Sequence, residues 1–373
     1  MPGLYFHIPF CKTKCSYCDF YSIARKNIIP EFIKSLVIEI EKKSHIFKNK
    51  LVNTIYFGGG TPSFLEIYQI EQILKHIQSH FRLSENLEFT FEANPEDLNN
   101  AYLRNLRDLG INRLSIGVQS LDDNILKFLR RRHTVNQTVS CIENAYKLGF
   151  SNISADLIYG IPNMSMDLWK KSLNVCLDLP ISHLSAYHLT IEEKTLLHKQ
   201  YKNREFNLPE DKNSLNQFKK LVKISESRDF YLYEISNLAK LGMESQHNSA
   251  YWKHFEYLGF GPSAHSFYEN KRSYNISDIK LYVNSLNTSE PFYEEELLTT
   301  KELLNESIML ALRTVKGLDL EKFREKFGQT ELDEFLSRLK HVRKEHYQIH
   351  NQYLSLNLDG LFVSDDIIST LFK

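Results

Sequence analysis

The chain has 373 residues, of which 42% are hydrophobic and 25% charged, so it can bury a large core and form one large domain plus a smaller one. Lysine plus arginine and aspartate plus glutamate balance at 46 each, which argues against a surface field that attracts nucleic acid or an anionic membrane. No apolar run approaches the roughly 18 residues of a membrane span, and no signal-like segment opens the chain. We therefore expect a cytoplasmic protein and leave peripheral membrane contact open.

The first predicted strand, 4–8, leads into three closely spaced cysteines, Cys11, Cys15 and Cys18. A [4Fe-4S] cluster normally takes four thiolates, so the spacing C-x3-C-x2-C predicts a cluster in which one iron has no protein ligand. Zinc is the alternative, with His7 as a fourth ligand, although no second Cys or His pair follows at finger spacing. Disulfides suit the chain less well, because the count of five cysteines is odd.

Short β-rich runs then alternate with amphipathic segments through the first half of the chain. The predicted strands are 4–8, 54–57, 87–91, 113–116, 153–158 and 183–189, and the predicted helices include 31–47, 66–81, 100–109 and 135–148. Gly110 and Gly149 follow the last two helices as C′ glycines, while Cys141 is expected to be a buried apolar group, as is Cys176. The alternation predicts an α/β fold with a parallel sheet, either open or curled into a partial (β/α)6 barrel.

Chemically suggestive residues follow these strands or lie late in them, which supports the barrel. They are the three cysteines, Gly58–Gly60, Glu92, Gln119, Asp156 and Tyr187. Ligands of parallel α/β folds bind at the carboxyl ends of the strands, so six separate segments are expected to meet at one mouth. The glycines fit no nucleotide-binding loop; they either form a tight turn or let a ligand approach backbone carbonyls.

From about residue 297 the pattern changes to helices at 300–313, 318–327 and 331–344, followed by β-like pieces at 353–356 and 361–363. Asp359-Gly360 between those pieces is typical of a hairpin. Three helices and a hairpin predict a small winged-helix-like domain over 297–373, with 1–267 as the barrel domain and 268–296 as the connection. The balanced charge argues against DNA binding by this domain.

Five segments in this order resemble a known family. They are Tyr5-x-His-Ile-Pro-Phe-Cys11, Gly58-Gly-Gly-Thr-Pro62, Glu92-x-Asn-Pro95, Gly117-Val-Gln-Ser120 and Asp156-Leu-Ile-Tyr-Gly-Ile-Pro162. The chain resembles, over nearly its whole length, the radical S-adenosylmethionine proteins related to oxygen-independent coproporphyrinogen III oxidase. Within that group its similarity is greatest to the heme chaperones.

The resemblance implies that S-adenosylmethionine chelates the open iron through its amino and carboxylate groups. The contacts it carries over to this sequence are Tyr5, Tyr17, Gly59, Gly60, Thr61, Glu92, Gln119, Arg131 and Asp156. The glycines would take the ammonium and the arginine the carboxylate, while acid and amide groups would surround the ribose or sulfonium. Arg131 lies in an arginine triplet where the family more often has Gly-Arg, so an assignment of the family arginine that is shifted by one residue stays open.

Two features favour a heme chaperone over the alternative, an oxidase that decarboxylates coproporphyrinogen III propionates. The oxidases typically carry a further cysteine two residues after the third, where this chain has Phe20, and a longer segment before the first, where this chain has ten residues. His247-Asn-x-x-Tyr-Trp252 resembles a motif associated with heme binding, which makes His247 a candidate heme ligand; His265 is a second candidate. The resemblance also implies acceptor hemoproteins, membrane-associated ones included, and an electron donor for the cluster, and it leaves enzymatic turnover open.

Overall fold

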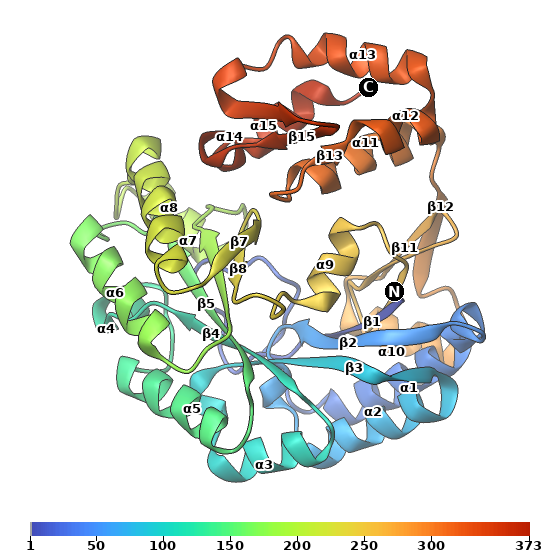
Figure 1. Cartoon of the computed structure of the whole chain (residues 1–373). Coiled ribbons are helices and arrows are strands. Elements are labelled where there is room, and N and C mark those ends of the chain that lie inside the picture. Colours follow the sequence, from blue (N-terminus) through green and yellow to red (C-terminus); the bar gives the residue numbers. More distant parts are fainter. Residues whose placement is uncertain (1) are drawn as a thin grey trace.

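The computed structural model describes residues 2–373 and organises them around one open sheet of twelve strands (Figure 1). Six central strands pair in parallel and in chain order: β1 (Gly3–Ile8), β2 (Leu51–Gly59), β3 (Arg82–Ala93), β4 (Arg113–Gln119), β5 (Asn152–Tyr159) and β6 (His183–His188). All six were predicted from the sequence. The first and last strands of this sheet, β12 and β7, do not pair with each other within the described chain, so the predicted partial barrel is confirmed.

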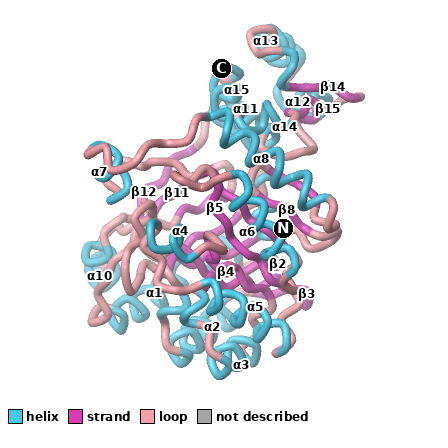
Figure 2. Tube along the Cα trace, turned by 90° about the vertical axis from the view of Figure 1, so that its left-hand side faces the viewer, coloured by secondary structure: helices cyan, strands magenta, loops and turns pink. Residues whose placement is uncertain are grey.

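Helices connect these strands and surround them on the outside (Figure 2). They are α1 (Ile29–Lys43), α2 (Ile67–His80), α3 (Asn100–Asp108), α4 (Asp123–Phe128), α5 (Val135–Lys147) and α6 (Met166–Asp178). Local chemistry sets their ends: Thr134 and Gln137 form a reciprocal capping box at the start of α5, and Gly149 beyond its end has a φ of 94°. Of the helices in residues 2–373, none is long and apolar enough to cross a membrane.

Additional strands extend both edges of the parallel sheet. Beyond β1 lie β9 (Tyr257–Phe260), β10 (His265–Tyr268), β11 (Lys271–Asn275) and β12 (Tyr293–Leu297); beyond β6 lie β8 (Asn237–Ala239) and β7 (Tyr231–Glu234). The helices of this half are α7 (Leu196–Lys202), α8 (Asp211–Glu226), α9 (Gln246–Trp252) and α10 (Ile279–Thr288). The segment 268–296 is thus part of the main sheet, with β11, α10 and β12, and the prediction of a simple connection is wrong there.

A buried charge network explains why this segment packs on the sheet. Glu39 of α1 is fully buried and pairs with Lys43 at 2.7 Å. Its carboxylate also accepts hydrogen bonds from Asn275 Nδ2 (2.6 Å), the Gly261 amide (2.8 Å) and the Tyr282 hydroxyl (2.5 Å). A buried carboxylate is tolerated only when it is paired and hydrogen-bonded, so these contacts join α1 to β11 and α10.

The C-terminal residues form a separate layer above the sheet (Figure 1). Its elements are α11 (Thr300–Leu312), β13 (Leu318–Asp319), α12 (Leu320–Phe327), α13 (Gln329–Leu339), β14 (Tyr347–His350), β15 (Tyr353–Leu356), α14 (Leu358–Phe362) and α15 (Ser364–Leu371). Three helices precede a hairpin, as expected for a winged-helix-like domain, and β15 pairs with both β13 and β14.

The predicted position of the hairpin is wrong, because β15 pairs with the strand before it rather than with 361–363. The turn lies at Asn351, which has a φ of 54°. Asp359-Gly360 instead belongs to the first turn of α14, where the side chain of Asn357 accepts a hydrogen bond from the Gly360 amide at 3.0 Å. This cap starts a helix and overrides the turn tendency of Asp-Gly.

We expect Glu39→Ala to destabilise the protein by roughly 3 to 5 kcal/mol, because the substitution leaves Lys43 buried without a counter-charge. Denaturant titration measures this difference. Glu41→Ala, on the exposed side of the same helix, is the control and should change the free energy of unfolding by less than about 0.5 kcal/mol. Equal midpoints for the two variants would contradict the proposed role of the network.

Candidate functional site

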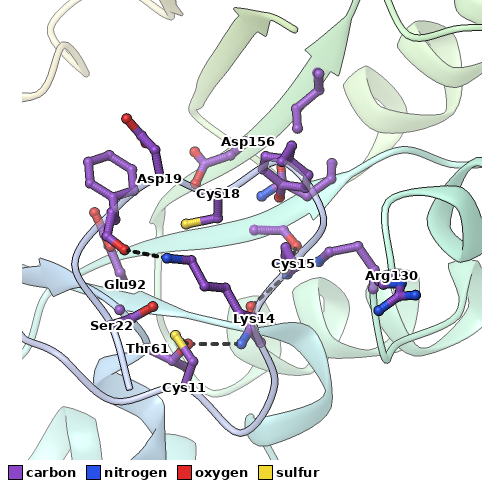
Figure 3. A pocket seen from close by; sticks show the side chains of 18 of the residues that line it. Cys11, Lys14, Cys15, Cys18, Asp19, Ser22, Thr61, Glu92, Arg130 and Asp156 are labelled. Carbon is purple, nitrogen blue, oxygen red and sulfur yellow. Dashed lines mark hydrogen bonds between the residues drawn. The ribbon is translucent and has the colours of Figure 1, made fainter. Parts of the chain in front are cut away.

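A cavity of about 380 Å³ opens at the carboxyl ends of the parallel strands, as the strand pattern predicts. Figure 3 shows its side chains, with the cysteine loop that follows β1 on one side. We call it the cysteine cavity. Its lining includes Cys11, Cys15, Tyr17, Cys18, Gly59, Gly60, Thr61, Glu92, Gln119, Arg131, Asp156 and Tyr187. The structure therefore brings together all but one of the predicted S-adenosylmethionine contacts.

The three cysteines of the loop are free thiols that are partly exposed to this cavity. Thr61 Oγ1 donates to Cys11 Sγ at 3.3 Å, and Arg131 Nη1 donates to Cys15 Sγ at 3.3 Å. Burial raises the pKa of the Cys18 thiol to about 11, so a metal would have to displace its proton. Hydrogen-bond donors and a guanidinium around sulfur suit thiolates that carry the negative charge of a cluster.

A single metal ion fits this loop less well than a cluster does. Across residues 2–373, no three His, Cys, Asp or Glu side chains gather around one point as the ligands of a zinc ion do. In a [4Fe-4S] cluster each cysteine binds a different iron, so the three sulfurs need not converge. The other two cysteines are buried in helices, as predicted: Cys141 in α5 and Cys176 in α6.

The glycines after β2 are required by the packing of the backbone. Gly59 has a φ of 99°, and a Cβ there would lie 2.5 Å from the ring of His7. A Cβ on Gly60 would lie 2.7 Å from the carbonyl oxygen of Ile8. The tight-turn interpretation therefore accounts for both glycines, and their contact with a ligand stays a prediction.

Two acidic residues, Glu92 and Asp156, lie on the wall of the cavity. Glu92 accepts hydrogen bonds from the Tyr56 hydroxyl (2.7 Å) and the Gly59 amide (3.2 Å), and burial raises its pKa to about 7. Asp156 accepts a hydrogen bond from Ser115 Oγ at 3.1 Å, and burial raises its pKa to about 6. Removal from water disfavours the charged forms, so each carboxylate gains from a polar or cationic ligand that enters the cavity.

The arginine triplet resolves into three different environments. Arg131 Nη2 donates to Asn94 Oδ1 (2.6 Å) and to the Gly117 carbonyl (2.8 Å), which aims the guanidinium at the cysteine loop. Arg132 instead pairs with Glu96 at 2.8 Å. Arg130 has a φ of 56°, a conformation that glycine adopts without strain. Because the resembling family has Gly-Arg here, this backbone favours Arg131 as the counterpart of the family arginine.

Tyr5 and His247 lie outside the cysteine cavity. The Tyr5 hydroxyl is 3.2 Å from His7 Nδ1, and its ring lines a second cavity. The side chain of His247 is buried, with Nδ1 2.8 Å from the Thr54 hydroxyl and Nε2 2.8 Å from the Tyr251 hydroxyl. Burial lowers the pKa of His247 to about 3. Both of its ring nitrogens are engaged, so this arrangement leaves none for a heme iron.

Sequence reasoning assigned no role in the site to three residues that position it: Tyr56, Asn94 and Ser115. Tyr56 orients Glu92, Ser115 orients Asp156, and Asn94 Nδ2 donates to Thr61 Oγ1 at 3.4 Å. Strand alternation is a signal that identifies Ser115 from the sequence. Ser115, Gly117 and Gln119 fall at every second position of β4, and all three line the cavity.

Known proteins share both parts of this chain. Residues 5–176 match the radical SAM superfamily and residues 298–363 match the HemN C-terminal domain. The heme chaperone HemW of Bacillus subtilis is 34% identical over 94% of this chain and 93% of its own length, and that of Lactococcus lactis is 35% identical over 87% and 84%. The structure of coproporphyrinogen III oxidase (HemN) from Escherichia coli covers 100% of this chain and 90% of its own with a TM-score of 0.86; at 20% identity this shows a common fold.

We expect Arg130→Gly to stabilise the protein by about 1 kcal/mol, because glycine relieves a left-handed backbone conformation. Thermal or denaturant unfolding measures the change. Arg130→Ala is the control, since it removes the same side chain and keeps the β-carbon. If both variants are equally stable, the backbone at position 130 is not strained.

We expect Glu92→Gln to remove a pH dependence of stability. In the unfolded chain Glu92 loses its proton near pH 4.5, whereas in the folded protein it keeps the proton up to a pKa of about 7. The folded state binds more protons in this window, so the wild-type free energy of unfolding should fall relative to the variant as pH rises from about 4.5 to about 7, by a total on the order of 3 kcal/mol. Denaturant titrations at several pH values test this, with Glu85→Gln on the exposed end of β3 as control; parallel curves for wild type and Glu92→Gln would contradict it.

Proposed function

Because this chain belongs to the HemW family of heme chaperones within the radical SAM superfamily, we propose that it binds heme and passes it to acceptor hemoproteins. The observation that carries this proposal is the identity of 34% with a heme chaperone over 94% of the chain. The likeness to the oxidase is one of fold at 20% identity, and one fold supports several functions.

We propose that Cys11, Cys15 and Cys18 hold a [4Fe-4S] cluster and that the cysteine cavity holds S-adenosylmethionine on its open iron. The donors to sulfur described above support this assignment, as does the gathering of the predicted contacts around one cavity. When bound and reduced, such a cluster would supply an electron to the sulfonium. The chain's own residues would bind and orient the ligand: Arg131, held by the Gly117 carbonyl, would take its carboxylate, and Asp156, placed by Ser115, would take its hydroxyl groups.

Phe20 favours the chaperone over the oxidase. It stands where the resembling oxidases have a further cysteine, and its side chain is 63% exposed at the edge of the cysteine cavity. An exposed phenylalanine offers a flat apolar contact and neither a thiolate nor an acid for chemistry on a propionate. The fold of the oxidase keeps coproporphyrinogen decarboxylation as the second candidate.

We further propose that the protein acts in the cytoplasm, that membrane-associated hemoproteins are among its acceptors and that an electron donor serves the cluster. The balanced charge of 46 basic and 46 acidic residues supports transient contact with such partners over tight electrostatic adhesion to lipid.

One experiment separates the two candidates. The protein is purified anaerobically and its cluster is reconstituted; heme binding is then followed by absorbance, and coproporphyrinogen III is incubated with the protein, S-adenosylmethionine and a reductant. We expect saturable heme binding, transfer to an apo-hemoprotein and no turnover of the porphyrinogen. Robust formation of protoporphyrinogen would overturn the chaperone proposal.

We expect Cys15→Ala to lose the visible absorbance of the cluster, because the remaining two thiolates cannot hold it. Cys141→Ala is the matched control, since that thiol is buried in α5 and is not part of the cavity lining. Iron and sulfide content after reconstitution provides the second measurement. Full cluster content in Cys15→Ala would exclude the proposed ligand set.

A further inference from the structure

We propose that the second cavity is the heme pocket and that His265 is an axial ligand of the heme iron. The cavity has a volume of about 530 Å³, within the usual range of roughly 300 to 1,000 Å³ for small-molecule sites. This inference rests on the proposed heme binding and adds to it the place and the ligand.

The sheet builds one wall of this cavity by strand alternation. Tyr5 and His7 of β1 point to the same face, and so do His265 and Phe267 of β10. The strand register brings side chains of neighbouring strands into one surface. Phe267 is paired with Tyr257 of β9 and with Arg272 of β11, and all three line the cavity. Gly259 allows the backbones of β9 and β10 to approach closely, since a Cβ on this residue would lie 2.1 Å from the His265 carbonyl oxygen.

Among the histidines that line this cavity, His265 is the one whose ring is available. His7 uses both nitrogens, Nδ1 with the Tyr5 hydroxyl (3.2 Å) and Nε2 with the Tyr21 carbonyl (2.8 Å). His254 Nε2 is 3.0 Å from Glu306, and its ring stacks on Phe267. The ring of His265 is exposed and makes no hydrogen bond within residues 2–373.

The chemistry of His265 suits an iron ligand. Partial burial of its ring, which leaves the residue open to the cavity, lowers its pKa, followed by the charge of Arg272, and this favours the neutral imidazole. A neutral imidazole nitrogen is the form that binds heme iron. Met309 of α11 also lines the cavity and brings a thioether, which is the partner of histidine in many hemes with two axial ligands.

The rest of the cavity suits a flat macrocycle with acidic edges. The aromatic lining consists of Tyr5, Phe20, Tyr21, Tyr251, Phe255, Tyr257 and Phe267. Aromatic rings pack against a porphyrin plane, and Arg272 at the wall can pair with a propionate carboxylate. Arg272 and His254 both contact Glu306 of α11, so polar contacts help to hold this helix beside the cavity.

The location also explains the sequence motif around His247. Tyr251 of that motif lines the cavity, and His247 Nε2 lies 2.8 Å from its hydroxyl. The histidine of the motif therefore positions a wall of the pocket and does not ligate iron. Asp19 and Phe20 of the cysteine loop line both cavities, which places the heme on the other side of this loop from S-adenosylmethionine.

The test is heme titration of the reconstituted full-length protein, with wild type, His265→Gly and His350→Gly followed by Soret absorbance. His350 is the matched control, an exposed histidine on β14 of the C-terminal domain. We expect His265→Gly to raise the Kd for heme at least about tenfold and to change the Soret spectrum, which responds to the axial ligand. His350→Gly should match wild type in both. Added imidazole should restore the wild-type spectrum in His265→Gly, which a merely misfolded variant would not show.

The outcomes separate this inference from the proposed function. Wild-type affinity and spectrum in His265→Gly would overturn the ligand assignment and leave heme binding intact. Absence of heme binding by the wild type would overturn both. A second variant, Met309→Trp, tests the place itself: filling the cavity from α11 should exclude heme while cluster content stays unchanged, and unaltered heme binding would show that heme sits elsewhere.

Discussion

The close approach of the backbone at the ends of β1 and β2 is the constraint on which the site depends. The Gly60 amide donates to the Ile8 carbonyl at 3.0 Å, and a side chain on Gly60 would collide with the same carbonyl. This contact sets the direction in which the cysteine loop leaves β1. It brings Cys11 within reach of Thr61, which follows the glycines directly. A shift of one ångström here would move all three sulfurs relative to the strand ends.

The cysteine loop divides the mouth of the barrel into two chambers of different chemistry. One is lined by carboxylates with raised pKa values, by Arg131 and by thiols, and it suits a zwitterionic ligand on a cluster. The other is aromatic and suits a flat apolar one. Asp19 and Phe20 belong to both linings. The two chambers therefore meet at one short segment of the cysteine loop, and the side chains of Asp19 and Phe20 form part of the wall of each.

Periodicity and spacing were sufficient for the parts of the fold that repeat. The six parallel strands, the C′ glycines and the meeting of the cysteines with Glu92 and Asp156 all follow from local patterns. One failure is local, since the Asn357 cap lies three residues before Gly360, and the other depends on contacts distant in sequence. Asn357 turned an Asp-Gly hairpin into a helix start, and Glu39 drew the segment 268–296 into the sheet across more than two hundred residues. The contacts of His247 with Thr54 and Tyr251 likewise could not be read from its motif.

The attachment of α11 places two polar contacts on one residue. Glu306 contacts both Arg272 and His254, beside the buried apolar side chains of the helix and the backbone hydrogen bonds between the end of the helix and the region of β7. A cation that competes for Glu306 would therefore remove both polar contacts at once, and apolar packing and backbone hydrogen bonds would alone hold the helix over the second cavity.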